Sequence, residues 1–175
     1  TLTSPTEAVR LGVGMLHQDP LDFLALRVLD NLLVGSSPHI LPDRAGARKA
    51  LQDLCAQFDF NLDPDAGIAS LSMGQRQQLE IVRLLWLGVR VLILDEPTTA
   101  ISAQQKAKLF AALHKLSAQG KTVIFVSHKL AEVEALCTQV TVMARGKVTG
   151  EALMPCPTER LVQMMFGQVI TVKKR

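Results

Sequence analysis

The sequence predicts an α/β fold in which the strands of a parallel sheet alternate with helices along the chain. Residues 91–94 and 122–126 are short runs of branched apolar residues, as in buried strands, and helical apolar periodicity lies between and after them. Asp95 and Glu96 directly follow the first run, and Pro97 then ends it. Because parallel strands joined by right-handed crossovers share one carboxyl edge, polar residues after each strand should meet at that edge.

Composition indicates a packed globular protein. The 175 residues are 48% hydrophobic and 20% charged, and the net charge of +3 is too small to indicate nucleic acid. The basic end at residues 173–175 reads as a solvated tail. Three widely spaced cysteines indicate buried thiols in a reducing compartment, not a disulfide framework or a zinc site: Cys55, Cys137 and Cys156.

No segment has the pattern of a membrane span or a signal peptide. Arg83 and Arg90 interrupt the longest apolar stretch, which falls short of the roughly 18 residues that a span needs. The first residues lack a basic and an apolar region. We therefore expect a cytoplasmic protein.

The remaining elements follow from local signals. We expect an irregular segment or short helix at residues 1–10, a strand at 11–16 and a short helix at 28–34 closed by Gly35. The clearest amphipathic helix covers residues 44–58. Further helices are expected near residues 72–87, 102–120, 130–137 and 158–166, and a fourth strand at 140–144.

Four polar side chains are predicted to converge at the carboxyl edge of the sheet: Gln18, Asp95, Glu96 and His128. Paired acids suit a magnesium–phosphate reaction, in which one carboxylate holds the hydrated metal and the other orients water or accepts its proton. A histidine nearby can donate to charge on a phosphoryl group. The alternative is a core strand that ends in a solvated acidic turn, beside a structural histidine.

A second candidate site opens the helix that begins near residue 72. Ser72 and Gly74 stand at its amino end, where free N–H groups and the helix dipole favour an anion. Ordinary serine capping is the simpler interpretation.

Together these motifs resemble the ATPases of ABC transporters. Residues 71–75, L-S-M-G-Q, are similar to the signature motif, and residues 91–98, which begin 20 positions later, are similar to the Walker B motif. Gln18 matches the Q-loop glutamine, and His128 matches the switch histidine. Residues 12–18 and 77–81 are most similar to nucleoside and simple-sugar importer subunits. The resemblance implies an incomplete P-loop NTPase-type parallel sheet, formed by residues 1–18 and 82–175, with a helical signature subdomain at 19–81.

The same resemblance implies ATP and Mg²⁺ as cofactors and gives each residue a role. Asp95 and Gln18 would hold magnesium, Glu96 would be the catalytic base, and His128 would contact the γ-phosphate. Gln18 would also sense the attacking water. Ser72, Gly74 and Gln75 would close over ATP held by a facing cassette.

Partners are implied in the same way. By this resemblance the chain would work as one of two paired cassettes on the cytoplasmic face of the membrane, attached to a transmembrane permease subunit. No nucleic-acid partner is expected, because the net charge is small. The apolar loop at residues 20–24 would belong to the groove that receives the permease. The transported solute, a nucleoside or sugar by resemblance, is chosen by other subunits.

The chain departs from the family pattern in one major respect. No G-x-x-x-x-G-K-[ST] phosphate loop occurs in it, since Gly120-Lys121-Thr122 has only the tail of that motif and leads into a strand. In the family this loop and a central strand precede the Q-loop, so both would lie before Thr1. We therefore expect a fragment that is inactive alone and has exposed sheet edges. Two smaller departures are Met73, in place of a glycine, and Ser102, in place of the D-loop aspartate.

Two alternatives remain open at this stage. The chain could be a non-catalytic module that lends its signature motif to another cassette. It could also belong to a soluble ABC ATPase that does not transport.

Overall fold

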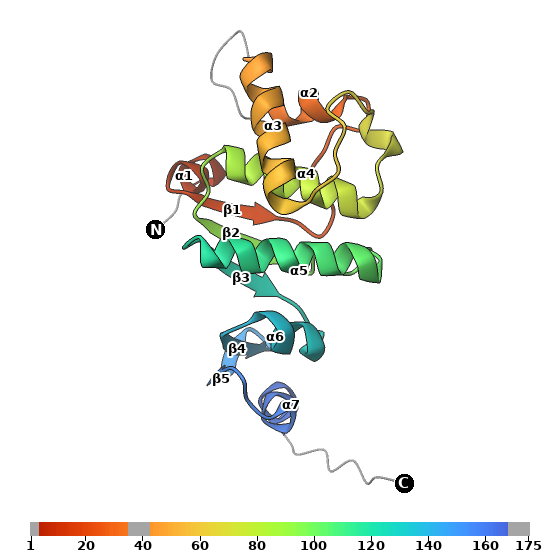
Figure 1. The fold of residues 1–175 in the computed structure, drawn as a ribbon. Coiled ribbons are helices and arrows are strands. Elements are labelled where there is room, and N and C mark those ends of the chain that lie inside the picture. Colours follow the sequence, from red (N-terminus) through yellow and green to blue (C-terminus); the bar gives the residue numbers. More distant parts are fainter. Residues whose placement is uncertain (1–3, 35–42, 168–175) are drawn as a thin grey trace. The chain divides into compact units, whose positions relative to one another are not determined.

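The computed structural model describes residues 4–34 and 43–167, and the chain divides into two compact units after Val126 (Figure 1). Gly35 lies outside the described residues, so its predicted role as a helix stop is not observed. The predicted division into residues 1–18 with 82–175 and residues 19–81 stays a prediction.

The first unit contains a three-stranded parallel sheet in the order β1-β2-β3 (Figure 1). Its strands are β1 (Val13–Leu16), β2 (Val91–Asp95) and β3 (Thr122–Val126). In β1 and β2 Leu16 pairs with Leu94, and in β2 and β3 Asp95 pairs with Val126. The parallel α/β prediction is confirmed, and all three strands end at the same edge.

Helices cover one face of this sheet. Leu92 and Leu94 are fully buried on that face. Phe125 of β3 meets Phe110 of α5 (Ala103–Ala118) edge to face, with ring centroids 6.2 Å apart. On β1, a Cβ added to Gly14 would lie 2.7 Å from the Leu84 side chain of α4 (Met73–Trp86), so glycine permits this close approach. The short helix α1 (Pro5–Arg10) precedes β1.

The other sheet face is more open than the sequence predicts. Ile124 and Val126 of β3 are each 46% exposed, and Met15 of β1 is 38% exposed. The prediction that residues 122–126 form a buried strand is therefore wrong. The physical reason is that β3 is an edge strand of this sheet and that α5 covers only the face bearing Phe125.

Four helical segments complete the first unit: α2 (Val28–Leu33), α3 (Arg44–Phe58), the 3₁₀ segment η1 (Ile68–Ser70) and α4. The apolar stripe predicted for α3 is buried at Ala47, Leu51, Cys55 and Phe58. Leu29 and Leu33 of α2 pack with Ala47, and Trp86 at the end of α4 covers them. This cluster joins α2, α3 and α4 around one small core (Figure 1).

The strand predicted at residues 140–144 is confirmed in the second unit, but its expected place in the parallel sheet is wrong. Its strands β4 (Gln139–Ala144) and β5 (Lys147–Leu153) form a separate antiparallel pair, not a further strand of the parallel sheet. Arg145 and Gly146 both have positive φ, at 51° and 73°, which is the backbone of a two-residue hairpin turn. The helices α6 (Leu130–Leu136) and α7 (Thr158–Phe166) complete this unit.

No helix within residues 4–34 and 43–167 is long and apolar enough to cross a membrane. Within the same residues, no group of three or more histidine, cysteine or acidic side chains could hold a metal ion. The three cysteines are free, and Cys55 is buried.

Candidate nucleotide site

The carboxyl edge of the sheet carries the two predicted acids. Because Leu16 pairs with Leu94, the chain after β1, with Gln18, leaves the sheet at the same edge as Asp95 and Glu96. Asp95 is the last residue of β2, and the N–H of Glu96 still donates to the carbonyl oxygen of Val126 at 3.0 Å. The register therefore places the segments that carry three of the four predicted residues at one edge of the sheet.

His128 belongs to the second unit. It follows β3 by two residues, as the sequence predicts. Its position relative to Asp95 and Glu96 stays a prediction.

The backbone at Glu96 is unusual. Its φ of 44° is left-handed, a conformation that non-glycine residues rarely adopt and that concentrates at functional sites. The turn is held by two bonds from Thr99: its N–H donates to the Glu96 carbonyl oxygen at 3.3 Å, and its hydroxyl donates to the Glu96 carboxylate at 3.2 Å. The strand thus ends abruptly at Asp95, with Glu96 held in the turn.

The donor set at this edge fits magnesium bound together with a phosphate ligand. Mg²⁺ usually takes only one or two protein carboxylates and keeps water and substrate phosphate oxygens as its other ligands. Asp95 and Glu96 supply two carboxylates, and Gln18 supplies an amide oxygen. Among the described residues, no cluster of three or more histidine, cysteine or acidic side chains could hold the ion without such additional ligands.

The amino end of α4 is a capping box. Ser72 Oγ accepts from the N–H of Gln75 at 3.3 Å, and the Gln75 side chain accepts in return from the N–H of Ser72 at 3.0 Å. Gln75 Nε2 also donates to the carbonyl oxygen of Asn61 at 3.2 Å. The capping interpretation of Ser72 is therefore confirmed. A role in binding phosphate is compatible with it but stays a prediction.

A second helix end lies against this one. Ser102 and Gln105 form the predicted capping box of α5, and Gln105 Nε2 also donates to Ser72 Oγ at 2.9 Å. A Cβ added to Gly74 would lie 2.5 Å from Gln105 Cδ, so Gly74 makes room for this amide. A polar pocket of about 250 Å³ opens here, lined by Asn61, Ser72, Gln75, Gln78, Gln104, Gln105 and Lys108.

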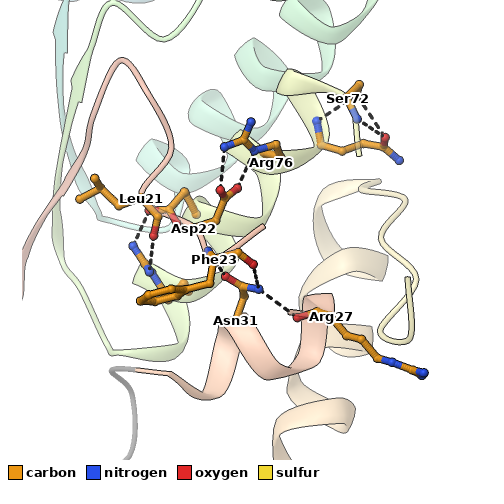
Figure 2. A network of polar contacts seen from close by, with 10 residues as sticks. Leu21, Asp22, Phe23, Arg27, Asn31, Ser72 and Arg76 are labelled. Atoms are coloured by element: carbon orange, nitrogen blue, oxygen red, sulfur yellow. Dashed lines mark hydrogen bonds and ion pairs between the residues drawn. The ribbon is translucent and has the colours of Figure 1, made fainter. Parts of the chain in front are cut away.

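The loop after Gln18 is apolar outside and charged inside (Figure 2). The exposed fractions of Leu21 and Phe23 are 58% and 55%, whereas the side chain of Asp22 between them is only 1% exposed. Asp22 accepts two hydrogen bonds from Arg76 of α4, both 2.6 Å long. The predicted exposed apolar loop is confirmed. Its ion pair, formed by the buried Asp22 and by Arg76, whose side chain is 22% exposed, is an addition that the sequence did not indicate.

A second buried carboxylate lies one helical turn from Arg76. Glu80 is 3% exposed and pairs with Arg83 of the same helix. Burial raises the pKa of Glu80 to about 7, although Arg83 and Arg76 both favour the ionised form, and Asp22 adds to the increase.

Comparisons with known proteins agree with this geometry. The chain has the fold of a solved ABC cassette, cbiO1 from Clostridium perfringens, described as part of the ABC transporter complex cbiONQ. The TM-score is 0.72 at 26% sequence identity, covering 93% of this chain and 64% of that one. The profile of the family described as ABC transporter matches residues 2–99. The class defined by the fold and the site is therefore an ATP-binding cassette.

Two relatives in sequence are named as import ATP-binding proteins. The nucleoside import ATP-binding protein NupA of Lactococcus lactis subsp. cremoris is 32% identical, covering 97% of this chain and 34% of that protein. The ribose import ATP-binding protein RbsA 1 of Rubrobacter xylanophilus is 34% identical, with the same two coverages of 97% and 34%. The chain belongs to the ABC transporter ATP-binding family. It spans about a third of the length of the curated relatives it matches.

The sequence did not predict two contacts near the site: the ion pair of Asp22 with Arg76 and the hydrogen bond from Gln105 to Ser72. Arg76, Glu80 and Arg83 have helical i, i+4, i+7 spacing, which indicates a charged stripe on one helix face. The acidic residue Asp22 in an otherwise apolar loop was the only feature of the sequence that could have indicated a basic partner for it.

Proposed function

We propose that this chain forms part of the ATP-binding subunit that drives import of a small solute, such as a nucleoside or sugar, through an ABC transporter. The observation that supports the proposal is the parallel pairing of β1 with β2, whose carboxyl ends lie at one edge of the sheet directly before the segments that contain Gln18 and the pair Asp95 and Glu96. The names of the relatives support import, and they support nucleosides and pentoses as the solutes to test first.

In this proposal each residue acts at the nucleotide's phosphate end. Asp95 holds the metal that accompanies ATP, and Mg²⁺ there supplies charge neutralisation on the phosphates. Glu96 accepts the proton of the attacking water, which Gln18 orients. His128 donates to the γ-phosphate. Ser72, Gly74 and Gln75 approach the ATP of a second, facing cassette with the amino end of α4.

The proposed partners are a second cassette and a transmembrane permease subunit, which would hold the protein at the cytoplasmic face of the membrane. Leu21 and Phe23 support the permease contact because they form an exposed apolar pair on a loop joined to the site. No role in binding nucleic acid is proposed.

A non-catalytic role is the second candidate. It is favoured by the absence of a phosphate-loop motif within these 175 residues, although the signature and Walker B motifs are present. In that case the chain would lend Ser72 to ATP bound elsewhere. Under either proposal the 175-residue chain alone should hydrolyse ATP negligibly, and measurable turnover by the purified chain would contradict this.

The test of the transport proposal is uptake. Cells in which this coding region is disrupted should lose ATP-dependent uptake of at least one labelled nucleoside, ribose or arabinose, and the intact gene should restore it. The protein should also co-purify with a membrane subunit. Unchanged uptake of all these solutes, with no membrane subunit recovered, would favour a soluble ABC ATPase instead.

A further inference from the structure

The loop that carries Leu21 and Phe23 is attached to two helices, so its backbone is held in place (Figure 2). Phe23 donates its N–H to Asn31 Oδ1 at 2.7 Å and accepts from Asn31 Nδ2 at 3.1 Å, which joins it to α2. Arg83 of α4 donates to the carbonyl oxygen of Leu21 at 3.3 Å. The exposed side chains are therefore presented by a backbone that α2 and α4 both hold.

The strongest of these attachments is the pair between Asp22 and Arg76. Two short, parallel hydrogen bonds fix both the distance and the angle between the planar groups. The second attachment, at Arg83, lies seven residues further along α4 on the same face, about 10 Å away at 1.5 Å per residue. A displacement of the loop would therefore act on α4 at two separated points.

Arg76 belongs to the same helical turn as Ser72. Its N–H donates to the carbonyl oxygen of Ser72 at 3.0 Å. The path from the apolar loop to the capped end of α4 thus contains only one ion pair, between Asp22 and Arg76, and one backbone hydrogen bond, between Arg76 and Ser72. We propose that Arg76, acting through Asp22, is a positioning residue that couples a partner seated on Leu21 and Phe23 to the placement of Ser72.

Stability alone does not account for this pair. Burying the Asp22 carboxylate costs desolvation energy, and apolar residues of similar volume are often as stable as a buried ion pair or more so. What a bidentate pair adds is geometric specificity, which suits a connection that must hold two elements in one orientation. The inference rests on the proposed function, because it requires a membrane subunit on the loop and ATP at Ser72.

The experiment uses the whole ATP-binding subunit that contains this chain, purified alone and in complex with its membrane subunit. ATP turnover is measured with and without that subunit for the wild type, Asp22→Asn/Arg76→Gln and Arg76→Lys. The matched control is Arg48→Gln/Asp65→Asn, which removes another bidentate Arg–Asp pair whose side chains are 38% and 51% exposed. We expect stimulation by the membrane subunit to fall at least about fivefold in the double variant, the lower end of measured coupling between sites.

The kinetic constants distinguish a loss of positioning by Arg76 from a general loss of structure. Stimulation is compared at saturating membrane subunit, and the KM for ATP and the unstimulated turnover should stay within about twofold of wild type, because coupling between sites is separable from binding at either one. Arg76→Lys keeps the charge but not the paired hydrogen bonds, so it should lose part of the stimulation, and the control should keep all of it.

Full stimulation in a folded Asp22→Asn/Arg76→Gln variant would overturn the inference and leave the proposed function intact. If that variant does not fold, full stimulation of Arg76→Lys overturns it instead. A wild-type protein that neither binds nor responds to any membrane subunit would overturn the proposed function itself.

Discussion

The amide nitrogen of Gln105 lies 2.9 Å from the hydroxyl oxygen of Ser72, so one side chain serves the amino ends of two helices. Gln105 Oε1 accepts from the N–H of Ser102 at 3.0 Å, which caps α5, while its Nε2 reaches the cap of α4. Since Ser102, the cap of α5, lies six residues after Glu96, this amide also connects the acid-bearing turn with the signature end of α4.

The contribution of the Gln105–Ser72 hydrogen bond to stability can be measured as the coupling energy between these two residues. Ser72→Ala should destabilise the chain by about 1 kcal/mol, the usual cost of removing a serine cap. Gln105→Glu keeps the acceptor for Ser102 but removes the donor to Ser72. In a double-mutant cycle by urea unfolding, the two changes should be non-additive by about 0.5–1 kcal/mol. Strict additivity would show that the contact contributes nothing in solution. Ser102→Ala with Gln75→Glu, which do not share a bond, is the control cycle.

Removing Arg76 alone should be severely destabilising. Arg76→Gln leaves the Asp22 carboxylate, only 1% exposed, without its charged partner, and breaking a buried pair in this way costs about 3–5 kcal/mol. The double variant Asp22→Asn/Arg76→Gln should recover most of that loss, because no charge is left buried. The single tryptophan, Trp86, lies at the end of α4 and reports unfolding by fluorescence.

Arg48→Gln is the control for this measurement. Its partner Asp65 is exposed, so the loss should stay below about 1 kcal/mol. Equal losses in Arg48→Gln and Arg76→Gln would contradict the burial of Asp22.

Stability should fall as the pH rises from about 4.5 to about 7, the interval between the ordinary pKa of Glu80 and its value in the folded chain. The folded-state pKa of about 7 exceeds the ordinary value of 4.5, so the folded chain binds the proton more tightly than the unfolded chain. The associated stability is fully present below pH 4.5 and is lost as the pH rises through about 7. The loss is about 3 kcal/mol, since each pKa unit corresponds to about 1.4 kcal/mol.

Urea unfolding at several pH values from 4.5 to 8 checks this, with Glu80→Gln as the comparison. The substitution should flatten the dependence, because glutamine does not titrate. A wild-type curve as flat as that of the variant would show that Arg83 and Arg76 keep Glu80 ionised throughout.

The open face of the sheet gives a further prediction. Leu94→Ala removes a fully buried side chain and should cost about 2–5 kcal/mol. Ile124→Ala, on the exposed side of β3, should cost less than about 1 kcal/mol in the same chain. Similar losses at both positions would show that something covers Ile124 in solution, and would point to association of the chain with itself or with another protein.

Much of the fold follows from local signals. The capping boxes at Ser72 and Ser102 are short-range hydrogen-bond patterns, so the starts of α4 and α5 could be predicted to within a residue. The strand at residues 91–95 was likewise recognisable, because an apolar run between turn signals requires burial. The sheet-edge location of Gln18, Asp95 and Glu96 followed from topology alone.

The errors concern relations between distant segments. Residues 140–144 have the composition of a parallel strand, and only the turn at Arg145 and Gly146 indicates an antiparallel partner. The exposure of Ile124 depends on which elements cover the sheet, which composition does not show. The pairing of Asp22 with Arg76 joins residues 54 positions apart, and no periodicity connects them.

The central claim is that Glu96, held in the turn after β2, acts as the base in ATP hydrolysis. The most direct measurement is ATP turnover by the purified transporter complex containing Glu96→Gln, compared with the wild-type complex. Glutamine is close in size but cannot accept the proton, so turnover should fall at least about 100-fold, the lower end for loss of a general base. ATP binding should persist. Turnover equal to that of the wild type would contradict the account and identify this chain as a non-catalytic partner.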